Sequence, residues 1–104
     1  MALPQLTPEQ RAQALEKAAD ARRERAQIKN RLKNAQGSLR DVVEAGKTSE
    51  VIGKMRVSAL LESMPGVGRI KAAQIMLDIG ISSGRRVRGL GVHQAAALLE
   101  RFEA

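Results

Sequence analysis

Residues 9–36 contain neither glycine nor proline, and this uninterrupted run dictates the first structural element. Thr7 is placed to be the N-cap of a helix, Pro8 suits the first helical position, and Gln10 completes a capping box. The residues that dominate the run (Ala, Arg, Glu, Lys, Leu and Gln) all favour helix. We therefore predict a helix from residue 8 to about residue 34, stopped by Gly37, with a length of about 40 Å.

The apolar face of this helix is thin. Its inward positions are alanines in the first half, Arg25 interrupts the spacing, and only Ile28 and Leu32 are large. We expect the second half to dock on a core and the first half to project or to lie along a partner. A coiled-coil strand is a weaker reading, because alanine is a poor core residue for one. We divide the chain into a basic arm, 1–36, and a helical domain, 37–104.

Further helices are predicted where apolar clusters follow capping residues. The predicted segments are Ser38 to Ala45, a helix capped by Thr48 or Ser49, a helix started by Ser58, Arg69 to Ile79 with Gly80 as its stop, and Val92 to Phe102. Residues 37–63 carry as many acidic as basic residues and are predicted to be the packing centre. No segment alternates apolar and polar residues over the length of a strand. The predicted fold is therefore all-α, with a long N-terminal helix packed on a compact helical domain.

Each of the last two helices is expected to bury its apolar positions. For the first of them the expected inward residues are Ile70, Ala73, Ile75, Met76 and Ile79. For the second they are Val92, Ala95, Ala96, Leu98, Leu99 and Phe102.

The charge balance narrows the choice of partner. Lys and Arg number 18 against 11 Asp and Glu, which gives a net charge of +7 and an isoelectric point near 10.8. So basic a chain attracts polyanions, nucleic acid first and an anionic membrane surface second, although simple solubility charge remains an alternative. No apolar run approaches the roughly 20 residues of a membrane span. The opening Met1-Ala2-Leu3-Pro4-Gln5 lacks the pattern of a secretion signal, so we expect a cytoplasmic protein.

Catalysis and metal binding find no support in the residue types. The chain has no cysteine, which excludes disulfides, thiolate metal sites and thiol catalysis. His93 is the single histidine, and no base–nucleophile pair or carboxylate pair stands out. We therefore expect a protein that is not an enzyme and that needs no cofactor.

The glycine turn, Pro65-Gly66-Val67-Gly68, separates two predicted helices. Glycines let a ligand approach the backbone closely, and the free N–H groups at the start of the following helix favour an anion. Val67 can plug the turn into the core, while Arg69 and Lys71 add positive charge beside it. An ordinary interhelix turn is the alternative. We predict that the glycine turn, with these neighbours, holds a phosphate of a nucleic acid.

The arginine segment, Arg85-Arg86-Val87-Arg88-Gly89-Leu90-Gly91, places three arginines on a predicted loop. Arginine binds phosphate with two parallel hydrogen bonds and fits into narrow minor grooves. A solvated surface loop is the alternative. We predict contact with nucleic acid.

Residues 57–102 resemble the helix–two-turns–helix module of ribosomal protein S13 and of formamidopyrimidine-type DNA glycosylases. The whole chain further resembles the actinobacterial integration host factors. The segments that carry this likeness are the opening Met1 to Thr7, the basic first helix, Lys54-Met55-Arg56-Val57-Ser58-Ala59-Leu60-Leu61, the glycine turn and the arginine segment. The catalytic N-terminal Pro-Glu pair of the glycosylases has no counterpart here, so their chemistry does not carry over.

The resemblance implies a nucleoid-associated protein that binds duplex DNA with little sequence preference, bends or compacts it, and supports phage integration. It assigns the arginine contacts to Arg85, Arg86 and Arg88, and the backbone-contacting turn to Gly66, Val67, Gly68 and Arg69. We add Lys71, Lys54, Arg56 and Ser58 to the predicted DNA-binding set. The expected partners are double-stranded DNA, a phage integrase on shared DNA, and no membrane, with the protein itself a monomer in solution.

Two rivals stay open: an RNA-binding protein of the S13 type, and a helical adaptor whose first helix pairs with a protein. Few apolar wedges are evident in the sequence. Bending of DNA is therefore expected to come from asymmetric phosphate neutralisation or from a second contact surface.

Overall fold

The computed structural model describes residues 5–103, and it is all-helical over this range, as predicted. The elements are α1 (Pro8–Lys33), α2 (Leu39–Ala45), α3 (Glu50–Gly53), α4 (Val57–Glu62), α5 (Arg69–Ile79), the 3₁₀ turn η1 (Val87–Gly89) and α6 (Val92–Glu103). Residues 1–4, which carry part of the family likeness and the expectation of no secretion signal, lie outside the described residues.

α1 begins as the sequence predicts. The Gln10 backbone N–H donates to Thr7 Oγ1 at 3.1 Å, and the Thr7 N–H donates to Gln10 Oε1 at 2.9 Å, which completes the capping box. The helix ends at Lys33, before Gly37 is reached. Its last carbonyls are taken up by the N–H groups of Ala35 and Gln36, with Ala35 at a positive φ of 55°.

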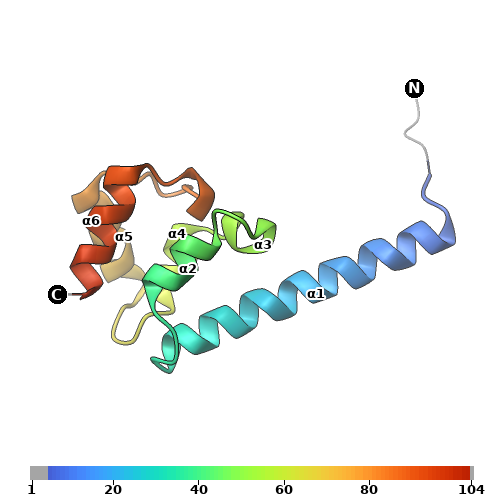
Figure 1. The fold of residues 1–104 in the computed structure, drawn as a ribbon, viewed down its shortest axis with the longest axis horizontal. Helices are drawn as coiled ribbons and strands as arrows, with labels where there is room; N and C mark the ends of the chain where they lie inside the picture. The colour runs from blue at the N-terminus through green and yellow to red at the C-terminus, as the bar shows by residue number, and fades with distance from the viewer. Residues whose placement is uncertain (1–4, 104) are drawn as a thin grey trace.

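α1 packs on the rest of the protein through its second half. Leu32 is almost fully buried and Ile28 packs against the same core, whereas Leu15 is 65% exposed. Figure 1 shows α1 leaving the compact group of α2 to α6 as a long rod. The expected packing of a long N-terminal helix on a compact helical domain is confirmed.

The core is aliphatic, because the single aromatic residue, Phe102, only packs at its edge. Its members come from all six helices and from the loops between them: Leu32, Leu39, Val43, Ile52, Met55, Val57, Leu60, Leu61, Val67, Ala72, Ile75, Met76, Ile81, Val87, Leu98 and Leu99. Seven of these side chains belong to residues 37–63, the predicted packing centre, and they come from α2, α3 and α4 with the residue between the last two.

Five expectations about single positions are wrong. Ser58 does not cap α4: the helix starts one residue earlier, and its cap position is Arg56, because the Val57 N–H donates to the carbonyl of Arg85 at 3.0 Å. Ile70 and Val92 are 87% and 84% exposed rather than buried, and Ala73 and Ala96 are exposed as well. Ile70 lies on the side of α5 opposite the buried Ala72, Ile75 and Met76. Val92 is the first residue of α6 and precedes the residues of that helix that reach the core.

Candidate nucleic-acid interface

A short antiparallel contact brings two basic segments together. The Val57 N–H donates to the carbonyl of Arg85, and the Val87 N–H donates to the carbonyl of Met55 at 2.9 Å. Arg56 and Arg86 are thereby paired in an isolated β-bridge. Met55, Val57 and Val87 are buried while Arg56 and Arg86 are exposed, as the alternation of an extended backbone requires.

Arg88 leaves this bridge on the side of α3. A side-chain carbon added at Gly53 would lie 3.3 Å from Arg88 Cβ and 2.8 Å from the Gly46 carbonyl, so glycine allows the arginine segment to lie close to α3. Gly46 packs against Val87 in the same way: a side-chain carbon added at Gly46 would lie 2.6 Å from Val87 Cγ1. The two glycines let η1 pack directly against the helical core.

The basic side chains around the β-bridge form a cluster whose members differ in whether they already have a partner within the protein. Lys54 Nζ forms an ion pair with Glu50 Oε1 at 2.8 Å. This hydrogen bond and the charge of Lys54, with smaller contributions from Lys17 and Arg88, lower the pKa of Glu50 below its ordinary value. Arg85 Nη1 donates to the Gly89 carbonyl at 2.9 Å, which ties its side chain to its own loop.

Arg56, Arg86 and Arg88 form no salt bridge within the described part of the chain. They are therefore the members of the cluster best able to meet an outside anion.

The glycine turn has the form that its sequence indicates. Val67 is buried, and its N–H donates to the Met64 carbonyl at 3.1 Å. Gly66 has a φ of +76°, a conformation that favours glycine. Gly68 precedes α5 without any side-chain cap, and nothing lies within 4 Å of a carbon added there. The backbone at the start of α5 is open to an approaching group.

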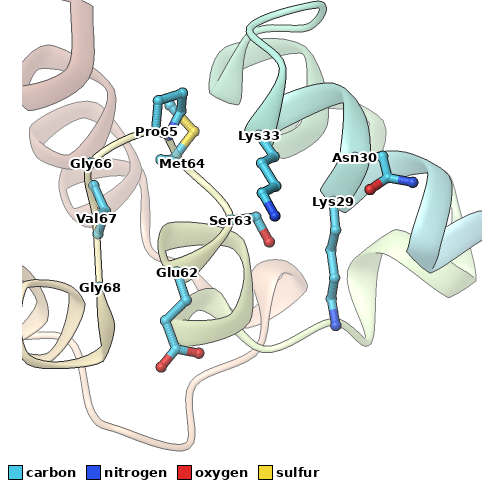
Figure 2. Close-up of a pocket in the computed structure, with 10 residues that line it drawn as sticks. All are labelled: Lys29, Asn30, Lys33, Glu62, Ser63, Met64, Pro65, Gly66, Val67 and Gly68. Carbon is cyan, nitrogen blue, oxygen red and sulfur yellow. The ribbon is translucent and has the colours of Figure 1, made fainter.

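Two lysines of α1 face the glycine turn. Lys29, Asn30 and Lys33 line a surface hollow of about 520 Å³ together with Glu62 and residues 63–68. Figure 2 shows Lys29 and Lys33 on the α1 side of this lysine hollow, with the turn and Glu62 across from them. The lysines are four residues apart, and the docking of Ile28 and Leu32 turns their face of α1 toward the turn.

A second hollow, of about 470 Å³, adjoins the first along α4 and α5. Ser58, Arg69 and the serines Ser82 and Ser83 contribute to its lining, and Glu62 borders both hollows. Hydroxyl groups and a guanidinium at one edge are suitable donors for a phosphate. Glu62 is the one carboxylate on this surface, and it opposes an anion there.

The predicted site residues thus fall into three groups. Gly66, Val67, Gly68, Arg69 and Ser58 line the two adjoining hollows, and Lys54, Arg56, Arg85, Arg86 and Arg88 gather around the β-bridge. Lys71 lines a different surface, on the outward face of α5. Lys29 and Lys33 are absent from the predicted set. Their spacing was visible in the sequence, but the face of α1 that meets the turn was not.

Among residues 5–103, His, Asp and Glu nowhere form a group of three or more that could hold a metal ion. None of the helices described combines the length and apolarity that a membrane crossing requires.

Comparisons with known proteins identify the family of this chain. Residues 32–102 match the family of the S13-like H2TH domain. The chain is 65% identical over 102 residues to an integration host factor of Streptomyces coelicolor, covering 98% of this chain and 95% of the relative. It is 58% identical over 102 residues to an integration host factor of Mycobacterium tuberculosis, covering 98% of this chain and 97% of the relative.

A solved structure described as sIHF bound to an 8bp palindromic DNA superimposes with a TM-score of 0.82 at 61% identity. The match covers 84% of this chain and 98% of that one. The likeness inferred from the sequence motifs is confirmed. The chain belongs to the actinobacterial integration host factor family and carries an S13-like H2TH domain.

Proposed function

We propose that this protein binds duplex DNA through the phosphate backbone, as a nucleoid-associated and non-enzymatic protein of the cytoplasm. One observation carries the proposal: an uncapped glycine turn faced by Lys29 and Lys33 lies in the same domain as the exposed arginines of the β-bridge. The similarity over nearly the full chain to proteins named integration host factor, one of them solved with DNA, supports it.

The glycine turn with its lysines and the arginines of the β-bridge are suited to binding different strands of a DNA duplex. The glycine turn offers backbone N–H groups to one phosphate, and Arg69, Lys29 and Lys33 add charge around it. Arg56, Arg86 and Arg88 then face the phosphates of the other strand across the minor groove. Phosphate contacts fix position and carry no sequence information, so binding should tolerate many sequences.

A salt titration tests the electrostatic part. If the protein neutralises about five to seven phosphates, log K should fall with log salt concentration with a slope of about −4.5 to −6. Fluorescence anisotropy with a labelled duplex at several salt concentrations gives this slope. A slope near zero would contradict binding through phosphates.

Replacement of the arginines tests the site. Changing Arg85, Arg86 and Arg88 to Ala should weaken binding to all duplex sequences, with the helical circular dichroism unchanged. Unaltered affinity would exclude the arginine segment from the interface.

The remaining parts of the proposal concern the consequences of binding. Phosphate neutralisation on one side of a duplex favours bending, and the basic α1 arm lengthens the footprint. We propose that the protein bends or compacts DNA as a monomer, and that it assists phage recombination by shaping DNA shared with an integrase. Energy transfer between dyes at the ends of a duplex measures the bending. Unchanged transfer on saturation with protein would remove the architectural role.

Competition separates DNA from RNA. The likeness to S13 alone covers residues 32–102, whereas the likeness to integration host factors extends over nearly the whole chain, and this favours DNA. Unlabelled duplex DNA should therefore displace a labelled duplex far better than structured RNA does. Displacement mainly by RNA would point to the ribosomal type of function. A partner protein captured after nuclease treatment would point to an adaptor.

A further inference from the structure

The outward face of α5 is an apolar stripe, although the sequence predicts Ile70 and Ala73 to be buried. Ile70 and Leu77 are 87% and 74% exposed, and Ala73 lies between them on the same side of the helix. The opposite side carries the buried Ala72, Ile75 and Met76. Three apolar residues in line on a surface helix point to a contact surface rather than to chance exposure.

The charges around the stripe select the kind of partner. Its lining residues include the two cations Arg69 and Lys71 and no carboxylate. Asp78, the nearest acid along α5, accepts hydrogen bonds from Gln74 at 2.8 Å and from Arg101 at 3.2 Å. A second copy of the chain related by a two-fold axis would bring these cations against their own equivalents, which disfavours a symmetric dimer here. A polyanion that also offers apolar surface fits best.

The position of Ile70 selects duplex DNA among polyanions. Gly68 lines the lysine hollow on one side and the surface of Ile70 on the other. Ile70 is the second residue of α5, so it stands directly beside the open backbone at which the proposed function holds a phosphate. A strand bound at the glycine turn therefore passes Ile70 with its sugars and base edges, while Leu77 lies about two helical turns, or roughly 10 Å, farther away.

We propose that Ile70 enters the minor groove of bound DNA as an apolar wedge and that it contributes to the bend. This rests on the proposed duplex binding and deepens it. Isoleucine is one of the side chains that minor-groove proteins insert between base steps, where partial unstacking kinks the duplex. The branched side chain has few rotamers, so little freedom is lost when it is held in the groove.

The test compares Ile70→Ala with three other variants of the full chain. Val92→Ala removes a side chain of nearly equal exposure away from the stripe, in a hollow bounded by α2, α6 and the arginine segment. Leu77→Ala probes the far end of the stripe, and Arg69→Gln removes a charge beside it. Because Ile70 is exposed, its replacement should leave the helical circular dichroism unchanged. Anisotropy with a labelled duplex is recorded over a range of salt concentrations, and end-to-end energy transfer reports the bend.

Ile70→Ala should lower the affinity about tenfold at every salt concentration, with the salt slope unchanged, since an apolar contact releases no counterions. It should also reduce the bend. Arg69→Gln should instead reduce the steepness of the slope by about 0.9. Leu77→Ala should have a smaller effect than Ile70→Ala, and Val92→Ala should have none.

Wild-type affinity and bend in Ile70→Ala would overturn the wedge while leaving phosphate binding intact. If Ile70→Ala and Leu77→Ala bind DNA normally but lose binding to anionic vesicles or to a partner protein, the stripe serves that partner and the wedge is refuted. Failure of the wild-type protein itself to bind DNA would refute the proposed function.

Discussion

Gly46 and Gly53 let the arginine segment pack closely on the core. Neither position needs a left-handed backbone. Their role follows from distances: a side chain on Gly46 would meet Val87, and one on Gly53 would meet the Gly46 carbonyl and Arg88. Space, rather than conformation, requires glycine at both.

Alanine at either glycine should therefore destabilise the protein. Val87 is buried and β-branched, so it cannot rotate away from a carbon only 2.6 Å from its Cγ1. We expect Gly46→Ala to lower the free energy of unfolding by about 1–3 kcal/mol, the usual cost of overpacking. Gly84→Ala is the control, because nothing lies within 4 Å of the added carbon. Thermal unfolding measures both, and equal midpoints would contradict the packing argument.

Lys29 and Lys33 were not predicted as site residues, and the structure places both of them at the glycine turn. If each meets one phosphate, Lys29→Gln with Lys33→Gln should make the salt slope less steep by about 1.8 and weaken binding to all sequences alike. The control changes Lys47 and Arg101 to Gln, an equal loss of charge at residues that pair with Glu44 and Asp78. If both double variants show the same slope, the lysine hollow is not a phosphate site.

At the scale of elements, α6 is held to α2 by a pair of charges as well as by core packing. Arg40 Nε and Nη2 donate to the two carboxylate oxygens of Glu103 at 2.8 and 2.7 Å. This two-pronged hydrogen bond, with the charge of Arg40, lowers the pKa of Glu103 below its ordinary value. The pair fastens the last turn of the chain described here to the start of α2.

Removing Arg40 should return the pKa of Glu103 toward its ordinary value. Because the folded pKa is the lower one, the pair stabilises the protein above the ordinary carboxyl pKa. That stabilisation is lost as the pH falls through the lowered value. Carboxyl-carbon NMR titration of Arg40→Gln should show the upward shift, with Lys47→Gln as the unaffected control. A Glu103 titration identical in wild type and Arg40→Gln would show that the pair does not persist in solution.

At the scale of the whole molecule, the projecting half of α1 sets the shape. The Cα radius of gyration is 16.1 Å and the extents are 51 × 32 × 25 Å, whereas a compact domain of about 100 residues has a radius near 13 Å. The larger radius of gyration comes from α1, whose first half does not pack on the core.

X-ray scattering of the free protein should therefore give a radius of gyration well above 13 Å, together with the mass of a monomer. The value should stay constant with dilution, because a monomer has no association to lose. A smaller radius would mean that α1 folds back on the domain. A mass of twice the chain would mean that the helix pairs with a second copy.

Most of the elements could be predicted from local sequence, because their signals act within a few residues. The capping box at Thr7, the caps Ser38 and Ser49 and the stop at Gly80 are short-range hydrogen bonds and backbone preferences. The start of α4 was misplaced by one residue for the complementary reason. There the Val57 N–H donates to the carbonyl of Arg85, which lies 28 residues farther along the chain.

What the sequence determined by itself is a basic, all-helical member of its family, with a glycine turn and an arginine segment of defined position. Only the tertiary structure decided which residues share a surface. It placed Lys29 and Lys33 of the long helix at the glycine turn, paired Arg56 with Arg86, and turned Ile70 outward. The physical reason is that α5 carries apolar residues on two faces, and periodicity cannot choose between them. Burial against α4 and α6 makes that choice.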